Sequence, residues 1–184
     1  MPVNRKTFFI LGLITLFGFG ALGLFVIGVF QAQSVVDVFT AGDNFWYQLY
    51  RGTLFGLIAA GNMLWLIETP ILRASKDFFS DLIREADLKL PDLLFLSLAA
   101  GVGEEILFRA GIQPFLGIWI TAVLFVAIHG YLNPFNWKMS IYGLLMVVVS
   151  GGLGYLFAYV GIYAAMMAHF LIDAILFIRF KYFS

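Results

Sequence analysis

Long apolar runs account for most of this chain and limit what it can fold into. The first of them covers roughly residues 7–30 and follows a short basic lead. A helix needs about 20 mostly apolar residues to cross the hydrocarbon core of a bilayer. Hydrophobic residues make up 62% of the 184 residues and charged residues only 12%, whereas a soluble domain has about 45–50% and about 25%. The sequence therefore predicts a membrane protein.

Six segments have the length and composition of membrane-spanning helices. They cover residues 7–30, 46–67, 92–111, 115–130, 139–159 and 161–179. The first run is too long for the core of a secretory signal and lacks a small-residue cleavage pattern, so we expect it to be retained. The fourth is short, which fits a tilted or partly re-entrant helix. The glycines of Gly52-x-x-x-Gly56 are interpreted as packing positions inside the bundle.

Residues 75–87 repeat apolar side chains with a period near 3.6, which predicts an amphipathic helix lying on the membrane surface. Pro91 then predicts a helix start just before the third span. The fold class expected is all-α: a polytopic transmembrane helical bundle of about six spans plus one interfacial amphipathic helix. No internal repeat or linker is visible, so residues 1–184 are expected to form a single membrane domain.

Lysine and arginine are distributed unevenly between the two sides of this bundle. With the N-terminus in the cytoplasm, the first outer connection carries acids but no lysine or arginine. This asymmetry agrees with the positive-inside rule and predicts that both termini are cytoplasmic. The basic residues that fall on the cytoplasmic side are Arg5, Lys6, Arg73, Lys76, Arg84, Lys89, Lys138, Arg179 and Lys181.

Two composition features narrow the functional classes. The formal net charge is zero and no basic run occurs, so nothing points to nucleic acid. The chain has no cysteine, which excludes disulfides, a thiol nucleophile and thiolate metal ligation. The apolar composition makes the lipid bilayer an expected partner.

Four residues of acid–base type stand inside apolar segments. They are Glu104, His129, His169 and Asp173, and they come from three separate parts of the chain. Ionisable side chains in hydrocarbon are costly, so they face a protein interior or a water-filled cavity and mark function. Each of these residues, taken alone, could be a packing or interfacial residue. Four of them in one short chain favour a single buried polar site.

Glu104 and its neighbour Glu105 are expected to have different tasks. Adjacent helical residues point about 100° apart, so the two carboxylates cannot serve the same face. Glu105 and Arg109 are four residues apart, where opposite charges meet. Their pairing would leave Glu104 on another face as a desolvated carboxylate, which suits a general base. The alternative is that all three form a structural ion network.

The relative depths of Glu104 and His129 are a difficulty for one shared site. A tight turn at residues 112–114 would leave them at depths that differ by roughly 8–9 Å, given a rise of about 1.5 Å per residue. A longer connection through Pro114–Gly117, or a tilted fourth helix, would reduce that difference.

Several known hydrolase chemistries are excluded by inspection. The chain has no H-E-x-x-H and no G-x-S-x-G, so neither the common zinc-protease signature nor a serine nucleophile turn is present. What remains is water activation by a carboxylate and a histidine, with further polar groups for the oxyanion. No cofactor or metal is required. A metal-dependent membrane hydrolase stays an alternative, because two histidines and two carboxylates can bind a divalent ion.

Three ordered motifs resemble those of the CPBP family, which includes CAAX proteases and bacteriocin-processing, Abi-type membrane proteins. They are E-E-x-x-x-R at 104–109, F-x-x-x-H at 125–129 and H-x-x-x-D at 169–173, within a motif-bearing core at 92–179. The resemblance implies a glutamate-dependent intramembrane endopeptidase acting on a membrane-associated or prenylated substrate. It also implies an integral protein of a prokaryotic plasma membrane or a related organelle membrane. Because some members are described as immunity or scaffold proteins, a non-catalytic role is the other alternative.

The resemblance also assigns a role to each residue. Glu104 and His129 would activate the attacking water, and His169 and Asp173 would form the oxyanion site. The supporting positions are Glu105, Arg109 and Phe125.

One departure from the family pattern concerns Asp173, which stands where prenyl-protein endopeptidases have asparagine. An ionised aspartate repels an oxyanion, so Asp173 must either be protonated or orient His169. We expect the protonated form, because a buried carboxylate without a positive neighbour tends to be neutral. A smaller departure is that Ala110 precedes Gly111 after the first motif.

Overall fold

The computed structural model describes residues 4–183, and within that range the regular structure is entirely helical. The predicted all-α bundle is thus confirmed. The elements, in chain order, are α1 (Arg5–Leu13), η1 (Ile14–Phe19), α2 (Gly20–Phe30), α3 (Val35–Thr40), α4 (Phe45–Ile67), α5 (Arg73–Glu85), α6 (Leu90–Ala99), η2 (Ala100–Glu104), η3 (Ile106–Ile112), α7 (Gln113–Ile128), α8 (Trp137–Tyr159) and α9 (Ile162–Tyr182). The three η elements are π-helical segments.

Four continuous helical stretches of the described chain are long and apolar enough to cross a membrane. They are Arg5–Phe30, Leu90–Ile128, Trp137–Tyr159 and Ile162–Tyr182. The second contains two of the predicted helices, which meet at a kink where Gly117 has φ 74°. The predicted helix at 46–67 is present as α4, but Arg51 and Asn62 lower its mean hydropathy and it is not among the four.

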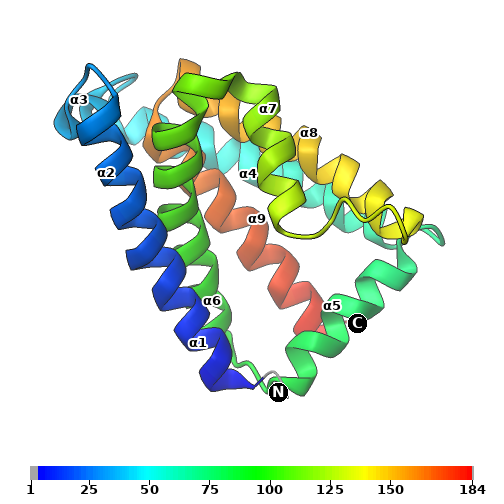
Figure 1. Ribbon diagram of the computed structural model, residues 1–184. Helices are drawn as coiled ribbons and strands as arrows, with labels where there is room; N and C mark the ends of the chain where they lie inside the picture. Colours follow the sequence, from blue (N-terminus) through cyan, green and yellow to red (C-terminus); the bar gives the residue numbers. More distant parts are fainter. Residues whose placement is uncertain (1–3, 184) are drawn as a thin grey trace.

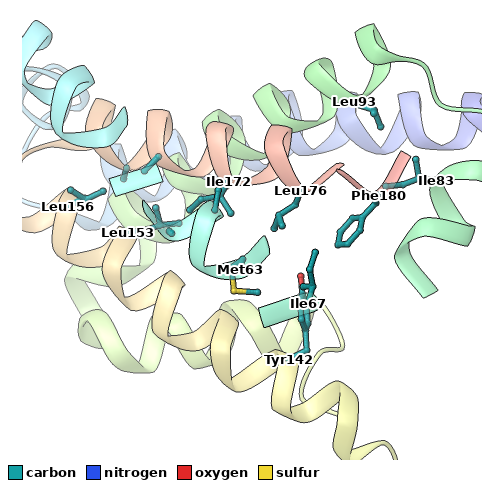
Figure 2. Close-up of a cluster of buried hydrophobic side chains, with 14 of the residues drawn as sticks. Met63, Ile67, Ile83, Leu93, Tyr142, Leu153, Leu156, Ile172, Leu176 and Phe180 are labelled. Atoms are coloured by element: carbon teal, nitrogen blue, oxygen red, sulfur yellow. The ribbon is translucent and has the colours of Figure 1, made fainter. Parts of the chain in front are cut away.

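Helix α9 lies at the centre of the bundle, with α4 and α8 on one side and α1 and α6 on the other (Figure 1). The main core is built around it from α4, α5, α6 and α8. Figure 2 shows Met63 and Ile67 of α4 near Ile172 and Leu176 of α9, with Phe180 toward α5. These side chains are almost completely buried. The arrangement places the last motif, on α9, in the middle of the molecule.

The expected internal role of the glycines on α4 is confirmed. A Cβ atom at Gly52 would lie 2.4 Å from the carbonyl oxygen of Ala164, and one at Gly56 would lie 3.0 Å from that of Ala168. These distances require the backbones of α4 and α9 to touch, which only small residues allow. Gly52-x-x-x-Gly56 therefore joins two helices of the same chain.

The predicted amphipathic helix is α5, which begins two residues earlier than expected. It lies across the end of the bundle at which α1 begins and α9 ends (Figure 1). Phe79 packs against Tyr142 and Phe180, and Ile83 is buried. Phe78 is 54% exposed and points away from this core. The helix therefore covers one end of the bundle with part of its apolar face.

The N-terminal helix packs directly on the helix that bears the first motif. A Cβ at Gly103 would lie 2.0 Å from the carbonyl oxygen of Thr15, and one at Gly23 would lie 2.7 Å from that of Ile106. The side-chain amide of Gln31 donates to the carbonyl oxygen of Ala110 at 2.6 Å. These contacts fix η2 and η3 against η1 and α2.

Candidate active site

The motif residues meet in a cavity of about 350 Å³ that is lined by side chains of α1, α6, α7, α8 and α9 and by Phe79 of α5. Glu104, His129, His169 and Asp173 line one part of it, which brings together all four residues that the sequence singled out. The rest of the wall is mostly apolar and includes Phe8, Leu11, Phe79, Leu96, Met146, Leu153, Leu176, Phe177 and Phe180. The cavity therefore combines one polar corner with a long apolar surface.

Glu105 is the centre of a buried polar network. Its Oε2 accepts from Nε of Arg109 at 3.0 Å, as the sequence predicted, and its Oε1 accepts from Nδ1 of His169 at 2.8 Å. Nη2 of Arg109 donates to Oγ of Ser150 on α8 at 2.8 Å. Glu105 and Arg109 are 0% exposed. Such a buried carboxylate depends on these partners, because an unpaired buried charge is strongly destabilising.

Glu104 lies on the cavity side of the same helix and has a different environment. Its Oε1 is 3.7 Å from Nε2 of His129, and its Oε2 is 3.9 Å from Nε2 of His169. Both distances exceed that of a direct hydrogen bond. Glu104 therefore faces two imidazoles across short gaps, and its oxygens can bind a third group in the cavity.

His129 is held by its neighbours on α7. Its Nδ1 donates to the carbonyl oxygen of Phe125 at 2.7 Å, and the two ring centroids are 4.4 Å apart. The guanidinium carbon of Arg109 lies over the ring of Phe125, 5.5 Å from its centroid. These contacts aim Nε2 of His129 at Glu104. The depth difference expected for a tight turn does not arise, since the kink at Gly117 redirects the chain.

Asp173 is one turn beyond His169 on α9. Its Oδ2 is 3.5 Å from Nε2 of His169. Because Nδ1 of His169 already bonds to Glu105, it is Glu105 that fixes the orientation of this ring. Asp173 faces the cavity on the other side of His169, beside Glu104.

Two residues near the site, Ser150 and Tyr131, lie outside the three motifs. Ser150 binds Arg109 from α8 and is 2% exposed. Tyr131, in the connection between α7 and α8, lines the cavity and packs beside His129. A polar residue within the apolar run at 139–159 was a usable signal for Ser150. Nothing in the sequence distinguished Tyr131 from the aromatic residues around it.

Two histidines and two carboxylates lie at this corner of the cavity, and such side chains can bind a divalent ion. No group of three or more His, Asp or Glu side chains within residues 4–183 is arranged to hold a metal ion. The observed separations around Glu104 thus do not form a ready ligand set.

Comparisons with known proteins agree with the three motifs. Residues 86–175 match the family described as Type II CAAX prenyl endopeptidase Rce1-like. The uncharacterized protein YpbD of Bacillus subtilis (strain 168) is 34% identical over 88 residues, which are 47% of this chain and 44% of YpbD. The chain thus spans less than half of the length of that curated relative. No solved structure matches this chain.

These findings and the four long apolar helices identify an integral membrane protein. The family match covers all three motifs and ends within α9, the helix that carries the last of them. By this match, residues 86–175 are similar to the Rce1-like type II CAAX prenyl endopeptidases, in agreement with the resemblance of the three motifs to the CPBP family.

Proposed function

We propose that this protein is an intramembrane endopeptidase that hydrolyses a peptide bond of a membrane-associated substrate with water activated by Glu104. The observation that carries the proposal is the contrast between the two neighbouring glutamates. Glu105 is hydrogen-bonded to Arg109 and His169, whereas Glu104 faces the cavity between the imidazoles of His129 and His169. A carboxylate in that setting is suited to take a proton from water.

The chemistry would proceed by direct attack of water on the peptide carbonyl. A water that bonds to Glu104 and His129 gives a proton to Glu104 as its oxygen attacks the carbonyl carbon. The oxyanion that forms is stabilised by His169 in its imidazolium form and by protonated Asp173. When the carbonyl re-forms, the C–N bond breaks and the leaving nitrogen takes the proton from Glu104.

The substrate proposed is a peptide attached to the membrane, including a prenylated one. The apolar part of the cavity offers side chains from α1, α5 and α9, such as Leu11, Phe79 and Phe177. An apolar chain bound there would be stabilised by about 25 cal/mol for each Å² of apolar surface that it buries. The peptide bond would then lie at the polar corner.

The decisive experiment measures hydrolysis of membrane-anchored peptides, with and without a prenyl group, by wild type and Glu104→Gln in proteoliposomes. We expect cleavage by the wild type alone, unaffected by chelators. Cleavage that chelators abolish and a divalent ion restores would favour the metal-dependent alternative. A well-folded wild type that cleaves no peptide better than Glu104→Gln would favour the non-catalytic alternative.

We further propose that both termini are cytoplasmic, because lysine and arginine are absent from the connection between α2 and α4. Ala41 in that connection and Asp77 on α5 are both exposed. Cysteines introduced there in this cysteine-free chain should react with an impermeant thiol reagent from opposite sides. Reaction of Asp77→Cys from outside the cell would overturn the orientation.

A further inference from the structure

Tyr131 stands at the polar corner of the cavity, next to the proposed water-activating histidine. Its ring centroid is 5.7 Å from that of His129, and the two planes are inclined by 30°. On its other sides it packs edge-on against Phe79 of α5 at 5.8 Å and Tyr142 of α8 at 5.4 Å. Three elements therefore hold the ring, so the direction of its hydroxyl is determined by packing.

The hydroxyl of Tyr131 is a hydrogen-bond donor without a protein partner among the residues that the structure describes. Burial, followed by the charges of Asp173 and Glu104, raises the pKa of this phenol. The phenol consequently keeps its proton at neutral pH. Tyr131 also lines the cavity together with both carboxylates, so an uncommitted donor is placed where a substrate would bind.

The proposed reaction needs such a donor. Asp173 can donate to an oxyanion only while it is protonated, and an ionised Asp173 would repel it. His169 has only Nε2 left for the substrate, because Nδ1 bonds to Glu105. A phenol, in contrast, keeps its proton at neutral pH and can therefore donate there.

We propose that the hydroxyl of Tyr131 donates a hydrogen bond to the carbonyl oxygen of the scissile peptide bond as that oxygen becomes an oxyanion. This assignment rests on the proposed function. When the water oxygen bonds to the carbonyl carbon, the electron pair of the C=O bond moves to oxygen, which Tyr131 stabilises. The pair returns as the C–N bond breaks. Tyr131 keeps its proton throughout, since the proton from water travels by way of Glu104.

The test compares Tyr131→Phe with Tyr163→Phe. Tyr131→Phe retains the ring contacts with His129 and Phe79 and removes only the oxygen, so folding should be preserved. Tyr163 packs against Phe39 and Phe45, outside the cavity. Loss of one oxyanion donor lowers kcat by about 10²–10³-fold in a studied protease, so we expect at least about a 50-fold lower kcat for Tyr131→Phe. KM should change less than about twofold, and Tyr163→Phe should match the wild type.

A second measurement separates transition-state stabilisation from a structural role. A phosphonate analogue of a cleaved peptide mimics the tetrahedral oxyanion. Tyr131→Phe should bind it more weakly by about the factor lost in kcat/KM, while its thermal unfolding stays that of the wild type. If kcat and analogue affinity remain within twofold in an active enzyme, the role of Tyr131 is overturned and the proposed function stands. If the wild type is no more active than Glu104→Gln, both fail together.

Discussion

The two sides of the motif-bearing helix differ in how their carboxylates are used. On one side, Glu105 is closed off from the cavity and shares its oxygens between Arg109 and His169. On the other, Glu104 stands 3.7 Å and 3.9 Å from two imidazole nitrogens. The residues are neighbours of the same type, so the difference comes from their partners. A carboxylate that is fully hydrogen-bonded organises a site, and one with remaining capacity can react in it.

The largest expected effect concerns the cavity side. Glu104→Gln removes the group that accepts the proton of water, so hydrolysis should fall by at least about 10³-fold, to the background rate of the assay. Stability should change little, because the two imidazole nitrogens that face Glu104 lie 3.7 Å and 3.9 Å away, beyond hydrogen-bond distance. Initial rates and thermal unfolding of the purified protein check both parts. Retained hydrolysis in Glu104→Gln would reverse the roles of the two glutamates.

The next largest effect is expected at Glu105, on the side of the helix that carries the buried polar network. Glu105→Gln leaves the guanidinium of Arg109 buried without a counter-charge, and breaking a buried pair costs about 3–5 kcal/mol. We expect a lower yield of folded protein and a lower midpoint of thermal unfolding. Glu105→Gln/Arg109→Met, which removes both charges, should recover part of the loss. A stable but inactive Glu105→Gln would contradict the structural role assigned to this side.

A smaller effect is expected where the same helix contacts η1. Gly103→Ala would place a Cβ 2.0 Å from the carbonyl oxygen of Thr15, and overpacking of this kind costs about 1–3 kcal/mol. Gly28→Ala is the matched control, since nothing lies within 4 Å of a Cβ at that position on α2. Unfolding in detergent should show Gly103→Ala destabilised and Gly28→Ala unchanged or slightly stabilised. Equal stability of the two variants would argue against the close packing of η1 on η2.

The smallest effect is expected at Glu68, an exposed carboxylate that can be compared with the buried Glu105. Glu68 pairs with Lys76 at 2.8 Å and with Arg179, and its side chain is 47% exposed. The hydrogen bond from Lys76 is the main influence that holds the pKa of Glu68 below its ordinary value of 4.5. Glu68→Gln should therefore lower the free energy of unfolding by less than about 1 kcal/mol.

The pH dependence of this pair follows from the direction of that shift. A depressed pKa in the folded state stabilises the protein above pH 4.5, and the stabilisation disappears as the pH falls through the folded value. Unfolding curves of wild type and Glu68→Gln should therefore differ at pH 7 and converge near the acid end. A difference that grows with acid would contradict the sign.

Much of this arrangement was predictable because apolar length and charge spacing act locally. The helices, the Pro91 start and the pair of Glu105 with Arg109 follow from patterns within a few residues. The contacts that the sequence missed are between distant segments. The bond of Glu105 to His169 and that of Arg109 to Ser150 depend on how α8 and α9 meet η3.

The N-terminal helix is the clearest example of information that the sequence did not hold. Its residues were predicted only as a membrane span, yet Phe8, Leu11 and Gly12 form part of the cavity wall. An apolar residue that faces lipid and one that faces a substrate cavity have the same composition signal. Only the packing of α1 on α6 separates them.

The π-helical turns around Glu104 make the number of residues between η2 and α7 a constraint in its own right. A π turn holds its carbonyl-to-amide bonds over five residues rather than four, so it accommodates an extra residue that an α-helix has no room for. Deleting one residue between 100 and 112 would let a π turn close to an α turn, which changes the angle at which the side chains within the stretch project relative to one another. Glu104 and Arg109 would then face different neighbours although every motif side chain was still present. Among relatives of this chain, spacing in this stretch should therefore tolerate fewer changes than the identity of its apolar residues.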